Sequence, residues 1–315
     1  MLDSLPPSFT YHPMTPSPLK ALPPAFICAV LFGSAFPAIK TVYGHWESQG
    51  IEIGLFAIWI FAGVRFMLAG LGLLCAARQP LVELRATPWK LLLIFTLAQT
   101  FLQYLCFYLG VYASSGSLAA LLAGSGSFWW MILAPIIVKS PWPSRLQWSA
   151  VTLGFIGVSL AVYSPGTGAS NPLLGAVFIL GSTFFGAIGI IVFGKIKPTM
   201  GSKAGSGFAL FFGGLGLFLV GLPAFSQLPE IFDAKVIYLT IWLAFVSAMG
   251  FALWNHLSTI YPVSLLASYR FLIPLCGMIE SLIILRSETP GWGLLVGGPI
   301  ILISIYAAQR LQRVR

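Results

Sequence analysis

The chain has 315 residues, of which 58% are hydrophobic and 8% charged, with a formal net charge of +9 and a mean hydropathy of +0.92. A soluble domain carries about 25% charged residues, so this composition excludes a soluble globule and predicts an integral membrane protein. The positions of the basic residues, given below, exclude nucleic acid as the partner that the positive charge serves. The four cysteines are scattered through apolar runs, a spacing that indicates no disulfide framework, metal site or cofactor.

The first 20 residues differ in kind from the rest. They hold five prolines among serines and threonines, which predicts a disordered cytoplasmic tail over residues 1–20. The segment has neither the basic start nor the cleavage site of a secretory signal, so the first apolar run is expected to stay in the protein as a membrane helix. At the other end, residues 309–315 are expected to form a basic cytoplasmic tail.

The remainder predicts an all-α integral membrane protein. A helix needs roughly 20 apolar residues to cross a bilayer core about 30 Å thick. Counted in that unit, the chain contains ten transmembrane helices, over residues 23–43, 53–77, 90–112, 115–138, 147–164, 172–195, 205–223, 235–255, 261–285 and 291–308. The connections are short and contain prolines and glycines, so no linker is long enough to hold a soluble domain.

Lysine and arginine set the expected orientation. If the N-terminus is cytoplasmic, the inner segments hold twelve of these residues and the outer loops hold only Lys235 and Arg286. Cytoplasmic loops carry the basic excess in membrane proteins. The sequence therefore predicts a multi-pass protein of the plasma membrane (the bacterial cell inner membrane) with both termini inside.

Short sequence words recur in one order along the chain. Gly33-Ser34 returns as Gly181-Ser182, 148 positions later, and six other matches follow at offsets of 143 to 147. The repeat divides the chain into residues 21–164 and 172–308, with five helices each. An odd number of helices makes the second half enter the membrane from the opposite side, and inverted repeats of this kind are the architecture of alternating-access transporters.

The motifs resemble the EamA family of the drug/metabolite transporter superfamily. They are Gly33-Ser34-x-Phe36-x-x-x-Lys40, Arg65-Phe66, the small-residue stretch 113–120 and Glu280. The resemblance implies two inverted five-helix repeats around a central cavity, and transport, often export, of amino acids or related metabolites. Some features depart from the family pattern. Ser127 stands where the second half has Pro274, Leu133 stands at the position of Glu280, and Arg270 is not part of the pattern.

Four charged residues fall within the predicted spans, namely Lys40, Arg65, Arg270 and Glu280. Each costs about 2.5–3.5 kcal/mol at a helix centre on insertion scales, so each needs a reason. Their counterparts in the other half are Ile188, Ala209, Ala123 and Leu133, so the repeated scaffold does not require charge there. Lys40 and Glu280 lie at similar depth, which leaves two roles open for them, a structural pair between helices 1 and 9 or a coupling site.

The two arginines are expected near the midplane, with no acid at their depth. They either cap carbonyls and stack on an aromatic ring such as Phe66 or Tyr269, or they bind an anionic group of a solute. The other candidate substrate-binding residues are polar or aromatic, and several of them equally suit interhelical packing. They are Gln99, Gln103, Tyr104, Trp129, Trp254, Asn255 and Ser34.

These residues favour a transporter over other classes of protein. An intramembrane enzyme needs clustered acid, base or nucleophile side chains, and the three histidines are all predicted outside the hydrocarbon core. We therefore expect a non-enzymatic exporter of a small anionic or zwitterionic, amino-acid-like metabolite. The alternatives are a translocator for nucleotide-sugars or phosphorylated metabolites and, more remotely, a non-transporting membrane scaffold. The solute's identity, the direction of flux, proton coupling and a homodimeric state stay open.

Overall fold

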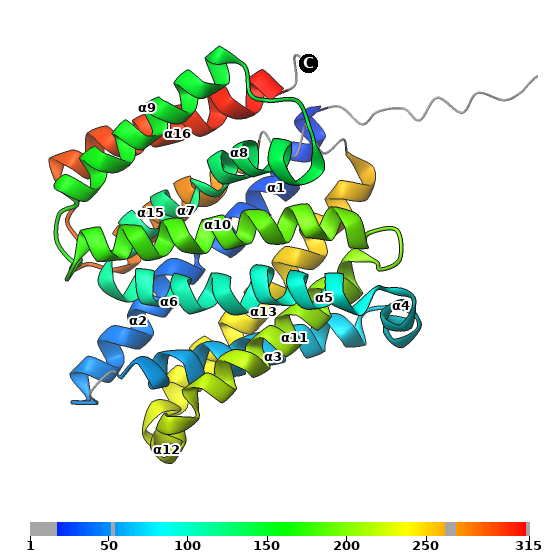
Figure 1. Cartoon of the computed structure of the whole chain (residues 1–315). Coiled ribbons are helices and arrows are strands. Elements are labelled where there is room, and N and C mark those ends of the chain that lie inside the picture. The colour runs from blue at the N-terminus through cyan, green and yellow to red at the C-terminus, as the bar shows by residue number, and fades with distance from the viewer. Residues whose placement is uncertain (1–17, 52–53, 262–268, 313–315) are drawn as a thin grey trace, which may run out of the picture.

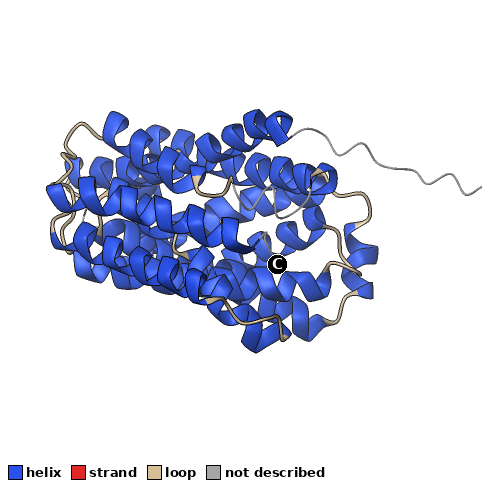
Figure 2. Ribbon diagram, turned by 90° about the horizontal axis from the view of Figure 1, so that it is seen from above, coloured by secondary structure: helices blue, strands red, loops and turns tan. Residues whose placement is uncertain are grey.

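The computed structural model describes residues 18–51, 54–261 and 269–312. All regular secondary structure in this part of the chain is helical, and its single β contact is an isolated bridge between Gly166 and Pro290 (Figures 1 and 2). Eight of the described helical spans are long and apolar enough to cross a membrane. This confirms a multi-pass, all-helical membrane protein.

The spans follow the predicted order closely. The first five contain α1 (Pro18–Gly33) with α2 (Ala35–Ser48), α3 (Leu55–Cys75), α5 (Trp89–Thr96) with η1 (Leu97–Leu102) and α6 (Gln103–Ala113), α7 (Gly116–Ala123) with α8 (Gly126–Val138), and α9 (Arg145–Tyr163). The next three are α10 (Pro172–Ile196), α11 (Ser202–Gly221) with the short η2 (Leu222–Gln227) and α12 (Leu228–Ile231), and α13 (Ala234–Ile260). The surface helix α4 (Pro80–Ala86) lies in the connection after α3.

Two further apolar helices, α15 (Leu272–Ile284) and α16 (Trp292–Gln312), are shorter in their apolar part than a full span. The expected ninth helix, 261–285, includes residues 262–268, which lie outside the described ranges. The same holds for most of the expected N-terminal tail. The first helix was predicted too short, because α2 continues to Ser48 rather than ending at 43.

The helices pack in pairs that lie far apart in the sequence. α3 packs along α11, α9 along α16 and α7 against α15 (Figure 1). Glycines permit the closest of these approaches, since a Cβ at Gly70 would lie 2.4 Å from the Phe211 nitrogen and one at Gly293 would lie 2.1 Å from the Leu160 carbonyl oxygen. Small residues take this role in membrane bundles because they let two backbones approach.

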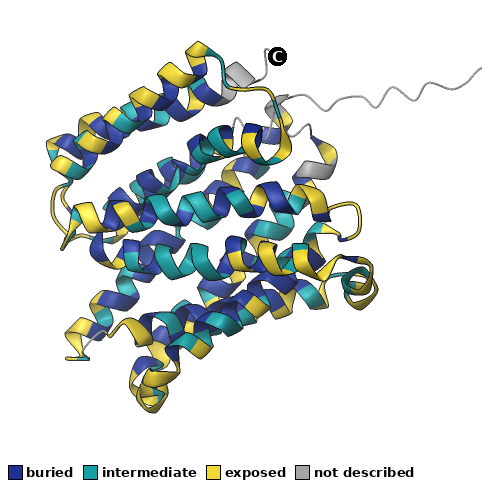
Figure 3. Ribbon diagram, viewed as in Figure 1, coloured by how far each residue is buried: buried dark blue, intermediate teal, exposed yellow. Residues whose placement is uncertain are grey.

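The bundle has two ends. We name the end with Pro18 the terminal end, and the opposite end, with the connections 49–54, 164–171 and 285–291, the Lys40 end. Many large apolar side chains are exposed, as a lipid-facing surface requires. Figure 3 shows exposed residues along the outer helices of the bundle.

Two spans are broken inside the bundle. The break between α1 and α2 falls at Ser34. Pro37 explains it, because proline lacks the N–H that would bond the Gly33 carbonyl and its ring crowds that carbonyl. The Ser34 hydroxyl donates to the Leu31 carbonyl at 2.8 Å, a contact that also bends helices. The second break, between α7 and α8, falls at Gly124-Ser125.

Candidate functional site

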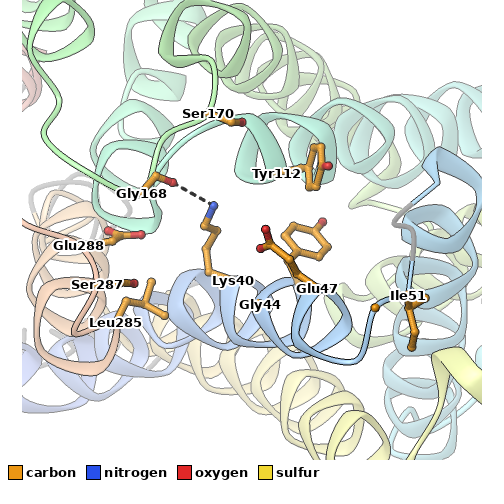
Figure 4. A pocket seen from close by; sticks show the side chains of 12 residues that line it. Lys40, Gly44, Glu47, Ile51, Tyr112, Gly168, Ser170, Leu285, Ser287 and Glu288 are labelled. Atoms are coloured by element: carbon orange, nitrogen blue, oxygen red, sulfur yellow. Dashed lines mark hydrogen bonds between the residues drawn. The ribbon is translucent and has the colours of Figure 1, made fainter.

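A pocket of about 580 Å³ opens at the Lys40 end (Figure 4). Helix α2 forms one wall with Lys40, Gly44 and Glu47, while α6 contributes Tyr112 and the connections contribute Gly168 and Glu288. Lys40 and Glu47 are seven residues apart, two turns of helix, so both side chains point into the same space. The pocket therefore presents charges of both signs.

Lys40 is anchored by backbone oxygens. Its Nζ donates to the Ser114 carbonyl at 2.8 Å and to the Gly168 carbonyl at 3.3 Å. Ser114 follows the last residue of α6, where carbonyls lack helical partners and a cation also complements the helix dipole. Because α2 continues to Ser48, Lys40 lies about 12 Å inside the helix end.

Glu288 was expected in an outer loop but is buried, with 6% of its surface exposed. Its carboxylate accepts from the Gly116 N–H at 2.6 Å, the Ser117 N–H at 3.1 Å and the Ser117 hydroxyl at 2.9 Å. These donors form the first turn of α7, where a negative charge is favoured. Lys40 and Glu288 thus stabilise the two sides of the α6–α7 junction.

Glu280 lies elsewhere, on α15 against the break in the first span. Its Oε1 is buried and has no hydrogen-bond partner in the described part of the chain. A Cβ placed on Gly33 would lie 3.0 Å from this oxygen. The structure therefore does not bring Glu280 and Lys40 together, and the expected structural pair is wrong for this conformation.

Arg65 is buried, with 3% of its surface exposed, and is fully engaged by the protein. It donates from Nη1 to the Tyr108 hydroxyl at 2.6 Å, from Nη2 to the Ser247 hydroxyl at 3.0 Å and from Nε to the Leu243 carbonyl at 3.3 Å. Its guanidinium also lies 4.5 Å from the centre of the Phe66 ring. These contacts join α3, α6 and α13, so the geometry favours a structural role over substrate binding.

Arg270 is in the opposite situation. It lies in the turn immediately before α15, and the residue as a whole is exposed. Thirteen residues of α15 separate this turn from the Lys40 end, a rise of about 20 Å. Trp254 is half-buried and packs on a small cluster that includes Cys28 and Leu257. The side chain of Asn255 lies outside the described part of the structure.

The two glutamines face α10. A Cβ at Gly189 would lie 2.5 Å from Gln99 Oε1, and one at Gly186 would lie 2.9 Å from Gln103 Oε1. Gln99 belongs to the π-helical turn η1, a feature that is frequent at functional sites. Both side chains therefore occupy the interface between η1–α6 and α10, where interhelical packing was the alternative expectation.

Three polar groups in this region lack a partner among the described residues. They are Gln103 Oε1 on α6, Trp129 Nε1 on α8 and Ser182 Oγ on α10. These helices adjoin one another, since α10 packs on both α6 and α8. Trp129 lies edge-on to Phe184 of α10, and Tyr104 packs on Phe66, with ring centres 5.3 and 4.1 Å apart. Ser34 is half-buried, and its hydroxyl donates a hydrogen bond to the Leu31 carbonyl.

The candidate residues thus separate into distinct places. Lys40 lies with Glu288 at the pocket, Glu280 beside Gly33, and Arg270 at the start of α15, while Arg65 belongs to the packed interior. Sequence reasoning missed Glu288, and the only signal for it was the Ser-Gly-Ser entry of α7, which marks a helix start but names no partner. No group of three or more His, Cys, Asp or Glu side chains that could hold a metal ion occurs among the residues described.

Comparisons with known proteins bear on the class of protein. No protein-family model matches the chain. The chain is 28% identical over 258 residues to the "Uncharacterized transporter YvbV" of Bacillus subtilis (strain 168). The alignment covers 78% of this chain and 80% of that protein. A solved chain described as "Crystal structure of protein" has the same fold, with a TM-score of 0.57 and 15% identity over 91% of this chain and 98% of that one. Together with the apolar helices, the relative supports a multi-pass membrane transporter.

Proposed function

We propose that the protein is a secondary transporter that exports a small zwitterionic or anionic, amino-acid-like metabolite by alternating access. The membrane helices and the transporter relative support the class of protein. The observation that carries the solute class is Arg270, an exposed residue in the turn where α15 begins. A helix N-terminus attracts negative charge, and an arginine beside it adds a bidentate donor for a carboxylate.

A ten-helix inverted repeat, as in the EamA family, is part of the proposal. The packing supports it, because the second helix of one half lies on the second of the other (α3 on α11), and the fourth and fifth helices pair likewise. The broken spans support it too. The break at Gly124-Ser125 falls 147 positions before residues 271–272, where α15 begins. Discontinuous helices are typical of transporter binding sites.

The unpartnered groups on α6, α8 and α10 support a place for the polar atoms of the solute at this interface. A buried polar atom without a hydrogen bond costs about 1–3 kcal/mol, so its persistence in an apolar bundle needs a compensating role. A solute at this interface would bond the amide oxygen of Gln103 and the indole N–H of Trp129. The aromatic rings beside them suit an apolar side chain.

A transport assay tests this function. Proteoliposomes that contain the purified protein are loaded with an equimolar mixture of the common amino acids. Efflux of each amino acid is then measured by mass spectrometry. We expect efflux of a subset, its loss in Arg270→Ala and its weakening in Arg270→Lys, which keeps the charge and loses the planar fork. Arg286→Ala removes an exposed arginine at the Lys40 end and serves as the control. Normal efflux by Arg270→Ala, or preferential efflux of organic cations, would contradict the proposal.

The orientation is proposed with the terminal end in the cytoplasm, on the strength of the twelve-to-two division of basic residues. Ser170 lines the pocket at the Lys40 end, and Lys203 is exposed near the terminal end. In a cysteine-free background, a membrane-impermeant thiol reagent should label Ser170→Cys and spare Lys203→Cys in intact cells. The opposite pattern would reverse the orientation.

A further inference from the structure

The functional site described above assigns no role to one acidic residue inside the bundle, Glu280. Glu280 is half-buried on α15, and its Oε1 is enclosed without a donor from the described residues. A buried carboxylate oxygen normally accepts a hydrogen bond, and an ionised carboxylate without one is strongly disfavoured in apolar surroundings. Glu288 shows the contrast within the same molecule, because three donors of α7 satisfy its carboxylate.

The groups that face Glu280 do not neutralise it. Cys276, one turn earlier on α15, interacts with it electrostatically but brings no positive charge. Helix α7, which packs on α15, contains no titratable residue. The other packed helices hold Lys20 and Cys28 on α1 and Lys40, Tyr43, His45 and Glu47 on α2. Lys40 bonds Ser114 and Gly168, and His45 contacts Asp233. Lys20 lies thirteen residues before Gly33 on α1, about 20 Å along the helix.

The immediate neighbour of the carboxyl is the break in the first span. Gly33 lies so close to α15 that a Cβ there would be 2.8 Å from the Gly277 nitrogen and 3.0 Å from Glu280 Oε1. Pro37 withholds the N–H that would bond the Gly33 carbonyl in a continuous helix. A protonated carboxyl is uncharged and carries an O–H donor, and this place has a shortage of donors.

We propose that Glu280 is a proton-binding site that couples a proton to solute movement. A proton from the aqueous phase on one side forms the O–H bond of the carboxyl in the conformation described here. Opening to the other side separates the carboxyl from Gly33, hydrates it and releases the proton there. This inference rests on the proposed transport function and adds the coupling ion to it. A proton-binding role replaces the structural pair expected between Glu280 and Lys40, because Lys40 instead bonds the Ser114 and Gly168 carbonyls.

A labelling experiment tests proton binding without any transport. A hydrophobic carbodiimide reacts with protonated carboxyl groups in apolar surroundings, and peptide mass spectrometry locates the adduct. In wild-type protein we expect modification at Glu280, decreasing as the pH rises, and none at Glu288. Modification at Glu288 with none at Glu280 at any pH would overturn the proposal. Because wild-type protein is used, misfolding of a variant cannot affect the result.

The coupling is tested in proteoliposomes that carry out the efflux described above. An imposed proton gradient should stimulate wild-type efflux and should have no effect in Glu280→Gln, while exchange of solute without a gradient persists. Glu230→Gln, at an exposed residue of α12, is the matched control and should keep the stimulation. Stimulation that survives in Glu280→Gln, or is absent from wild type, overturns the coupling. Labelled Glu280 in a protein that moves no solute instead contradicts the proposed function alone.

Discussion

The first span of residues 21–164 and the first span of residues 172–308 contain the same Gly-Ser motif near their middle and fold differently. Gly33-Ser34 lies at a break between α1 and α2, whereas Gly181-Ser182 lies inside α10, which is continuous for 25 residues. Position 37 is proline, and its counterpart in α10 is Phe185. Gly33 contacts the backbone of α15, while no atom lies within 4 Å of a Cβ built on Gly181.

The comparison shows that the repeated Gly-Ser motif does not by itself determine the local structure. The break requires the missing N–H of Pro37, and the close contact requires a partner helix on the glycine side. The charged residues follow the same division, since Arg65 and Lys40 have apolar counterparts in Ala209 and Ile188. The two halves share a scaffold, and single substitutions give each half its own chemistry.

The largest effect is expected at Arg65. Arg65→Ala removes a buried cation and leaves the Tyr108 and Ser247 hydroxyls without their partner, at about 1–3 kcal/mol for each such group. We expect a clear fall in folded yield and in the thermal unfolding midpoint in detergent, with Arg65→Lys intermediate because it cannot reach three acceptors in a plane. Substitution of exposed Arg286 by alanine should leave both quantities unchanged. An unfolding midpoint of Arg65→Ala equal to wild type would refute the structural assignment.

The next effect separates the two glycines. Gly33→Ala places a Cβ against the backbone of α15 and should destabilise the protein by about 1–3 kcal/mol, as overpacking does. The matched change Gly181→Ala enters open space and replaces a mid-helix glycine, so it should be neutral or stabilise by up to about 1 kcal/mol. Thermal unfolding of the two variants measures the difference. Equal midpoints would show that the contact with α15 has no energetic weight.

The conformational prediction concerns the break itself. Pro37→Ala restores an N–H at position 37 and should straighten the first span, while Phe185→Pro should kink α10 near Gly181. Spin-label distances along each span, measured in a cysteine-free background, report the change. A bend that persists in Pro37→Ala would assign it to Ser34 and tertiary packing instead.

The smallest effect lies at the Lys40 end, where His45 Nε2 and Asp233 Oδ2 are 2.5 Å apart. The pKa of the Asp233 carboxyl is lowered mainly by the hydrogen bond it accepts from the Val236 N–H. The hydrogen bond with His45 lowers it further. A lowered pKa in the folded state adds stability that is present above the unfolded pKa, near 4, and is lost as the pH falls through the folded value. Asp233→Asn keeps a helix cap but loses the ion pair.

This variant should therefore be less stable than wild type near neutral pH by about 0.2–1 kcal/mol, because the pair is partly exposed. The gap should begin to narrow below about pH 4 and should close as the pH falls through the lowered pKa of the folded carboxyl, where the wild-type group also becomes neutral. Unfolding midpoints measured across pH give the comparison, and Glu230→Gln is the control for a surface acid. A gap that widens in acid would have the wrong sign.

The sequence predicted the fold further than it predicted the site. Long apolar runs and their breakers gave the order and approximate ends of the helices, because each span must satisfy its own backbone in lipid. The end of α2 was missed because the polar residues from Gly44 to Ser48 form helix beyond the apolar run. The described apolar parts of α15 and α16 are shorter than a full membrane span, whereas the sequence predicted a full span for each. Composition does not reveal this difference.

The site depended on contacts that no pattern encodes. Glu288 reaches α7 from more than 170 residues away, and only the folded chain shows that three donors meet it. Lys40 and Glu280 were assigned to similar depth by counting residues, yet depth does not say which helix face a side chain takes. For Arg65 the sequence left stacking on Phe66 and solute binding open, and the guanidinium does lie 4.5 Å from the centre of the Phe66 ring.

The most direct test of the central claim, alternating access, is a distance across the pocket at the Lys40 end. Spin labels at Gly44 and Ser170, both exposed and on opposite walls, report whether this end opens and closes. We predict two distance populations whose ratio changes when the amino-acid mixture is added, and a shift toward the longer distance in Lys40→Gln, which loses the bonds to Ser114 and Gly168. A single distance that neither the mixture nor Lys40→Gln alters would contradict alternating access.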